Sequence, residues 1–189
     1  MYYHASPTAG IKVLEPKASN HGVPLIYFSQ KRENVLVYLS NAVEKFCRDT
    51  GYVHTGKWTK WASYGFQNGI QQLEEYYPNA LTETFRGVPG YIYRAAAIQE
   101  AAQEIHIPDA AVSSLPVPVD GVEFILDAYE AILEAERQGK IFITRYEAMT
   151  ERTRDWLRKT VQEEYDNAGE QPEYRYFLKN KFDFIQTGL

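Results

Sequence analysis

The stretch Leu25-Ile26-Tyr27-Phe28-Ser29 is short, branched and aromatic, and it leads directly into a helical pattern. Such a composition is typical of a buried strand. Apolar residues then recur at helical spacing over residues 35–46, with Ser29 placed as the N-cap, and Asp49-Thr50-Gly51 ends the pattern. A buried strand that continues into a helix indicates a domain that combines sheet and helices.

Two further segments predict strands. Met1 to His4 reads as a short strand entering a turn, because Ser6-Pro7-Thr8-Ala9-Gly10 is rich in residues that break regular structure. Gly90-Tyr91-Ile92-Tyr93-Arg94-Ala95 has the alternating, aromatic composition of another strand. We therefore predict an α+β fold with a small split sheet, mixed or antiparallel, and helices packed on it.

The rest of the chain predicts mainly helices. Ile70–Arg86 has a helical pattern interrupted at its proline. Asp120-Gly121-Val122-Glu123 has the form of a capping box that opens a helix closed by Gly139. Another helix is expected over residues 150–167, and the aromatic tail Tyr174 to Ile185 is expected to dock on the core.

Length and composition indicate one domain. The 189 residues are 44% apolar, enough for one continuous core. We expect residues 1–189 to form a single domain, with an α+β core over 1–120 and a mainly helical part over 121–189. The single cysteine, Cys47, allows no internal disulfide and is expected to be buried and inert. With neither a secretory leader nor an 18-residue apolar stretch, cytoplasmic localisation without membrane insertion is expected.

The charge balance disfavours nucleic acid as a partner. The chain has 20 Lys and Arg against 25 Asp and Glu, a formal charge of −5. One segment, Lys57-Trp58-Thr59-Lys60-Trp61, interleaves basic and aromatic residues as a single-strand-binding surface does. Two lysines are few for that purpose, so a surface hairpin is the favoured interpretation and nucleic-acid binding is the alternative.

Local signatures of several catalytic classes are missing from the sequence. The four histidines are isolated, and neither HExxH nor a Cys/His ligand spacing occurs, so no metal site is predicted. The sequence also has no Walker-type glycine loop and no GxSxG elbow. Phosphate-loop and serine-hydrolase chemistry therefore have no local support.

The pairing of Tyr3-His4-Ala5-Ser6 with the later Leu25-Ile26-Tyr27-Phe28-Ser29 resembles the ADP-ribosyltransferase superfamily. In that superfamily a first-strand His holds the ribose of NAD, and a second-strand aromatic residue stacks on nicotinamide. The resemblance covers roughly residues 2–47. It implies an NAD site in which His4 contacts ribose, Ala5 supplies backbone contacts, Ser6 orients the turn and Tyr27 stacks.

This arrangement is chemically reasonable. A neutral imidazole can hydrogen-bond a ribose hydroxyl, and an aromatic face can support the nicotinamide ring. The oxocarbenium-like state formed as nicotinamide leaves also needs a carboxylate nearby. The strand-like Tyr91-Ile92-Tyr93 is followed by Arg94 rather than an acid, so the catalytic candidate is Glu123, for which the capping box is the competing role. Glu100 and Glu104 are further candidates.

Two functions remain open from the sequence. One is an NAD-binding, ADP-ribosyltransferase-like protein that either transfers ADP-ribose to a macromolecule or has lost catalysis. The other is a non-enzymatic interaction protein that uses an aromatic surface for a protein partner, since aromatic residues make up 14% of the chain.

Overall fold

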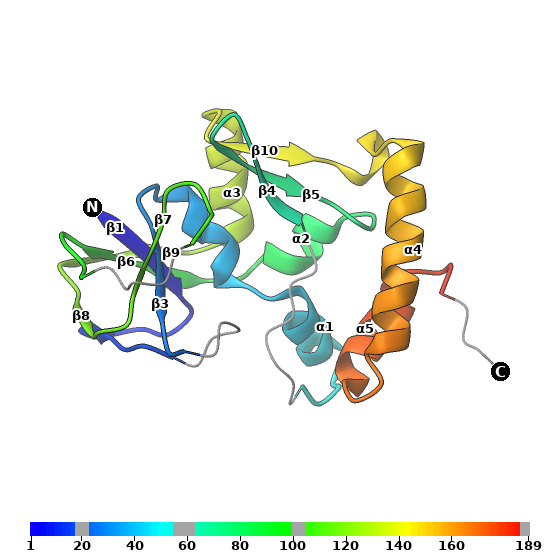
Figure 1. Ribbon diagram of the computed structural model, residues 1–189, viewed down its shortest axis with the longest axis horizontal. Coiled ribbons are helices and arrows are strands. Elements are labelled where there is room, and N and C mark those ends of the chain that lie inside the picture. The colour runs from blue at the N-terminus through cyan, green and yellow to red at the C-terminus, as the bar shows by residue number, and fades with distance from the viewer. Residues whose placement is uncertain (18–22, 55–62, 100–104, 186–189) are drawn as a thin grey trace. The chain divides into compact units, whose positions relative to one another are not determined.

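The computed structural model describes residues 1–17, 23–54, 63–99 and 105–185 and has an α+β fold (Figure 1). The chain divides into two compact units. The sheet unit comprises Met1–Leu39, Phe66–Gln71 and Phe85–Ile141, and the helical unit comprises Ser40–Gly65, Gln72–Thr84 and Phe142–Leu189. The chain therefore passes between the units several times.

The sheet unit is built on a five-stranded antiparallel sheet in the order β7-β3-β1-β6-β9. Its strands are β1 (Tyr2–Ser6), β3 (Ile26–Ser29), β6 (Gly90–Ala95), β7 (Ala110–Ser113) and β9 (Gly121–Ile125). The strands predicted at the N-terminus, near residue 25 and over residues 90–95 are confirmed. β1 lies in the middle of this sheet, with β3 and β6 on either side.

The two faces of the five-stranded sheet pack against different partners. The face that carries His4, here called the His4 face, contributes to an apolar cluster with the small sheet of β2 (Val13–Leu14) and β8 (Val117–Pro118). The other face, here called the η1 face, contacts the 3-10 helix η1 (Glu33–Leu39). A Cβ atom on Gly90 would lie 2.5 Å from Leu39 Cδ2, so glycine allows this close approach.

The single helix predicted after residue 29 is wrong, because the chain forms two helices there. η1 ends at Leu39, and α1 (Ala42–Thr50) begins after Asn41, whose side-chain oxygen accepts a hydrogen bond from Glu44 N at 2.9 Å. This N-cap starts a new helix at a point where the apolar spacing alone continues unbroken. The predicted end is confirmed, since Gly51 has a φ of 71° and caps α1.

The helix predicted over Ile70–Arg86 is wrong in its first half. Residues Ile70–Glu74 form β5, in which the buried residues Gln71 and Leu73 alternate with half-buried neighbours. Asn68 and Gly69, with φ values of 51° and 74°, join β5 to β4 (Ser63–Gln67). An Asn-Gly pair is a strong hairpin signal, and here it outweighs the helical spacing. Only α2 (Ala80–Phe85) is helical.

The capping box predicted at Asp120 is also wrong. Residues Gly121–Ile125 pair with β6 as strand β9, and helix α3 (Ala128–Arg137) begins instead after Asp127, whose side chain accepts from Tyr129 N and Glu130 N. The sequence contains the same Asp-x-x-Glu pattern twice, seven residues apart, at Asp120 and at Asp127. Pairing with β6 turns the first copy into a strand and leaves the second as the cap.

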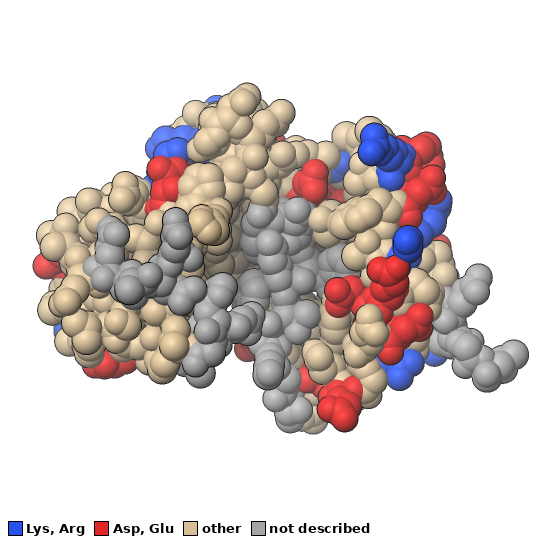
Figure 2. Space-filling model, in the orientation of Figure 1, with Lys and Arg blue, Asp and Glu red and all other residues tan. Residues whose placement is uncertain are grey.

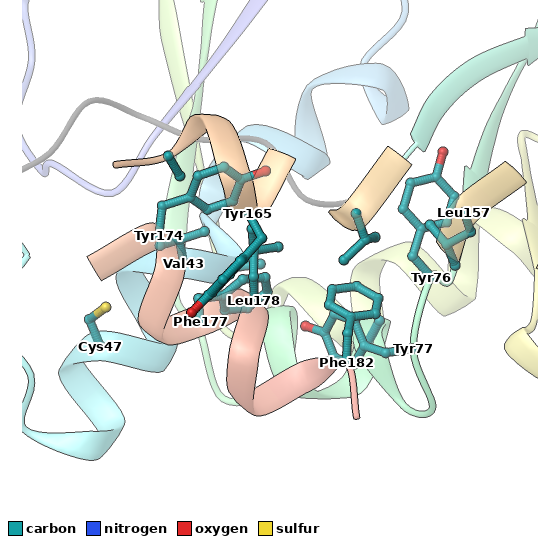
Figure 3. Packing of buried hydrophobic residues seen from close by; sticks show 14 of the residues in the cluster. Val43, Cys47, Tyr76, Tyr77, Leu157, Tyr165, Tyr174, Phe177, Leu178 and Phe182 are labelled. Atoms are coloured by element: carbon teal, nitrogen blue, oxygen red, sulfur yellow. The ribbon is translucent and has the colours of Figure 1, made fainter. Parts of the chain in front are cut away.

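The helical unit packs α1, α2, α4 (Glu151–Asn167) and α5 (Pro172–Lys181) around one aromatic cluster (Figure 3). Tyr77 meets Phe182 edge-on at 5.7 Å, and the Phe177 and Leu178 side chains are fully buried. The prediction that the tail docks on a core is confirmed, and so is the helix over 150–167. Cys47 is fully buried, as expected, and burial raises the pKa of its thiol.

The outer surface of α4 alternates acidic and basic side chains, as Figure 2 shows. Ion pairs join Arg158 to Asp155 at 3.0 Å and Arg154 to Glu151 at 3.6 Å along the helix. Mixed charge of this kind gives a solvated helix rather than a continuous basic surface. The candidate stretch Lys57–Trp61 lies outside the described residues.

A three-stranded sheet, in the order β10-β5-β4, contains three of the five points where the chain passes between the units. β10 (Ile141–Thr144) is followed by the short 3-10 helix η2 (Tyr146–Ala148). Among the described residues, no helix is long and apolar enough to cross a membrane.

Candidate functional site

His4 lies on β1, opposite Tyr93 of β6, and is half-buried. Its Nδ1 atom lies 2.8 Å from the carbonyl oxygen of Tyr27, and its ring centre lies 5.9 Å from that of Phe28. Because a carbonyl oxygen only accepts hydrogen bonds, Nδ1 carries the proton and the other ring nitrogen, Nε2, is an acceptor. Burial lowers the His4 pKa, an effect partly offset by the Tyr27 hydrogen bond, so the ring is neutral at pH 7.

The turn that follows β1 is held by side-chain hydrogen bonds. Ser6 Oγ accepts from Thr8 N at 3.2 Å. The hydroxyl of the buried Tyr93 donates to the Thr8 carbonyl at 2.6 Å and accepts from Ile11 N at 3.3 Å. The backbone just after His4 is therefore fixed by a residue of the neighbouring strand.

The strand register divides the residues predicted for the site between the two faces of the sheet. Residues paired across antiparallel strands point to the same face, and successive residues alternate. Since Tyr3 pairs with Ser29, and Ala5 pairs with Ile92, which in turn pairs with Glu123, the side chains of Ala5, Tyr27 and Glu123 lie on the η1 face. His4 and Ser6 point to the opposite face. His4 thus meets Tyr27 through the Tyr27 backbone carbonyl, while the two side chains lie on opposite faces.

Glu123 is held by an arginine that the sequence analysis missed. The Arg32 guanidinium donates from Nε and Nη2 to the two Glu123 carboxylate oxygens, at 2.9 and 2.5 Å. These hydrogen bonds hold the pKa of Glu123 below its ordinary value, and the positive charge of Arg94 acts in the same direction. Arg32 and Glu123 are 91 residues apart, so no local pattern could have paired them.

Replacing Glu123 with Gln is expected to alter the dependence of stability on pH. A carboxylate whose folded-state pKa is lowered stabilises the fold above its unfolded-state pKa of about 4.3, and this contribution is lost as pH falls through the folded-state pKa. Both side chains are partly exposed, so the stability difference between wild type and Glu123→Gln should be at most about 1 kcal/mol at pH 7.

Urea unfolding at pH 7, 5, 4 and 3 measures this difference. It should shrink as the pH falls below the ordinary Glu pKa. The exposed Glu147→Gln variant is the control and should differ little from wild type at every pH. A difference between wild type and Glu123→Gln that is the same at pH 7 and pH 3 would contradict the assignment.

The described residues contain no group of three or more His, Cys, Asp or Glu side chains placed to hold a metal ion. The remaining acidic candidates, Glu100 and Glu104, lie outside the described residues. Comparison with known proteins gives no significant match to this chain among protein-family models, curated proteins or solved structures.

Proposed function

We propose that this protein is an ADP-ribosyltransferase-like protein that binds NAD and does not transfer ADP-ribose. The observation that carries the proposal is the placement of His4: its imidazole lies on the central strand, and its Nδ1 is 2.8 Å from the Tyr27 carbonyl oxygen, which leaves Nε2 of the neutral ring as an acceptor. A ribose hydroxyl can donate to such a nitrogen. The fixed turn after Ser6 supports a preformed site, because its backbone needs no reorganisation on binding.

The aromatic contact is proposed for the His4 face rather than for Tyr27. On that face Tyr91 of β6 lies opposite both Ser6 and Phe124, and the Tyr91 and Phe124 ring centres are 5.2 Å apart. The Phe124 side chain is 54% exposed, so a planar ring has access to it. We assign stacking of a flat ring of NAD to this pair, because it lies on the His4 face and aromatic side chains can support a planar ring.

The positions of the carboxylates are the reason to propose that the protein does not transfer ADP-ribose. The described strand residues on the His4 face include no Asp or Glu. Glu123 is on the η1 face, and Arg32 neutralises its charge. In transferases of this superfamily, NAD donates its ADP-ribosyl group through a cationic transition state. A site without a free carboxylate lacks the main electrostatic stabilisation of that transition state.

Calorimetric titration with NAD tests the proposal. The wild type should bind, and His4→Ala and Phe124→Ala should each weaken binding by about tenfold, equivalent to about 1.4 kcal/mol. Tyr27→Ala, on the opposite face, and His106→Ala, an exposed control, should keep near-wild-type affinity once circular dichroism shows that they are folded. With labelled NAD and cell lysate, no label should become attached to protein.

Two results would decide against the proposal. Absence of heat or of any shift in melting temperature with wild type and NAD would remove NAD binding. Transfer of label to a lysate protein, if it is abolished in Glu123→Gln, would show that the protein is an active transferase.

A second candidate function, a non-enzymatic interaction protein, is favoured by the exposed apolar side chains of β9. This strand is at the edge of the five-stranded sheet. Its Val122 and Phe124 are each 54% exposed, and Leu126, which directly follows it, is 77% exposed. Exposed apolar side chains next to an edge strand are typical of surfaces that bind another chain. A wild type that does not respond to NAD would favour this candidate over the first.

A further inference from the structure

The helical unit contains a cavity that the proposed NAD site does not use. Its volume is about 210 Å³, and it lies between α1, Tyr77, the end of α2 and the last residue of α5. Its lining combines charged and aromatic side chains: Ala42, Lys45, Phe46, Asp49, Tyr77, Glu83, Thr84 and Lys181. All of them belong to the helical unit, so the cavity is a feature of that unit alone.

Two lysine side chains in the wall are largely buried. Lys45 and Lys181 are each 16% exposed, whereas their partners Asp49 and Glu83 are 50% and 43% exposed. Lys45 Nζ lies 2.7 Å from Asp49 Oδ2, and Lys181 Nζ lies 2.5 Å from Glu83 Oε2. Each ammonium group has three N–H donors, so each keeps donors beyond its one carboxylate partner among the described residues.

The placement of the charges in the lining favours an anion. Two lysines face two carboxylates there, but the lysines are the more deeply buried groups and the carboxylates lie toward solvent. Asp49 is also shared with Arg48, outside the lining, whose Nε lies 3.7 Å from its other carboxylate oxygen. A cation with unused donors in a partly dehydrated wall gains most from a negatively charged acceptor.

The apolar side of the cavity is held rigidly. Lys181 Nζ lies 4.7 Å from the centre of the Phe46 ring and 5.3 Å from that of Tyr77. The Phe46 ring is itself packed against Phe177, with ring centres 5.6 Å apart. Aromatic walls fixed by the core provide a preformed surface for a flat or branched apolar group.

We propose that this cavity binds a small carboxylate with an aromatic or branched apolar body. The carboxylate would accept hydrogen bonds from Lys45 and Lys181, and the apolar body would pack on Phe46 and Tyr77. The cavity volume corresponds to about seven water molecules in the liquid, which limits the ligand to about ten non-hydrogen atoms. A ligand of that size binds with a Kd on the order of 1 mM.

Benzoate is the probe, and benzamide, of the same shape without charge, is the matched control. In a titration followed by amide shifts in NMR spectra of the full chain, benzoate should shift residues of α1 and α2 saturably, with a Kd on the order of 1 mM. Benzamide should bind at least about tenfold more weakly, because a charge-assisted hydrogen bond is about twice as strong as a neutral one.

Variants locate the binding. Lys181→Met keeps an unbranched side chain over the two rings and removes the charge, so it should raise the benzoate Kd by about tenfold, equivalent to about 1.4 kcal/mol. Lys179→Met, at an exposed position on the same helix, should leave the Kd unchanged. Ala42→Leu fills the cavity while keeping both lysines, and it should abolish binding even if Lys181→Met fails to fold.

Three results would overturn the proposal. They are shifts that do not saturate by about 20 mM benzoate, twentyfold above the expected Kd, equal affinity for benzoate and benzamide, and equal losses in Lys179→Met and Lys181→Met. Since no part of the cavity contributes to the His4 face, these outcomes are independent of NAD binding.

Discussion

Replacing Phe177 with Ala is expected to lower the free energy of unfolding by about 3–5 kcal/mol, the usual cost of removing a fully buried phenylalanine ring. Phe177 is completely buried, and its ring meets Phe46 of α1 at 5.6 Å and Tyr77 at 5.9 Å, both edge-on. The substitution would remove edge-to-face contacts and leave a cavity among three elements. Since domains are stable by only about 5–15 kcal/mol, a loss of this size approaches complete unfolding.

Urea denaturation followed by far-UV circular dichroism measures this effect. Lys179→Ala, two residues along the same helix and exposed, is the matched control and should change stability by less than about 0.5 kcal/mol. A loss below about 1 kcal/mol for Phe177→Ala would mean that α5 does not hold the cluster together.

Tyr93→Phe should destabilise the protein by about 1–3 kcal/mol, although only one oxygen atom is lost. The Tyr93 hydroxyl donates to the Thr8 carbonyl and accepts from Ile11 N, and its side chain is 1% exposed. Its removal leaves both backbone groups without the partner that fixes the turn after β1. NMR spectra should also show a change at the His4 ring, because His4 lies opposite Tyr93.

Tyr91→Phe provides the matched comparison. Tyr91 is on the same strand and the same face, and its hydroxyl has no recorded hydrogen bond among the described residues. Its loss should cost less than about 0.5 kcal/mol. Equal effects of the two substitutions would show that the turn does not depend on the Tyr93 hydroxyl.

Local patterns predicted the elements whose signals are contained in a few neighbouring residues. The strand near residue 25, the strand over 90–95 and the helix over 150–167 are examples, since Thr150 caps α4 as a Ser/Thr N-cap does. The hairpin at Asn68-Gly69 also had a local signal, but the helical spacing that follows it obscured that signal. Helix and strand patterns compete over short apolar stretches, and spacing alone does not decide between them.

The candidate site was predicted less completely than the fold. The sequence singled out His4 and Ser6, and their local geometry is that of a fixed strand end and turn. Residue order could not show that Tyr27 and Glu123 lie on the other face of the sheet. A shift of one residue in strand register reverses every side chain, and register is set by long-range pairing.

The sequence by itself determined the α+β class, the central strands, the buried state of Cys47 and the docking of the aromatic tail. Each of these depends on apolar spacing or on a short capping or turn pattern, which acts over a few residues. Only the tertiary structure decided that the first of two identical Asp-x-x-Glu patterns is a strand, that Arg32 neutralises Glu123, and that Lys45 and Lys181 border one cavity. These features join residues far apart in the chain. Their interactions contribute to stability only once the strands have paired and the helices have packed.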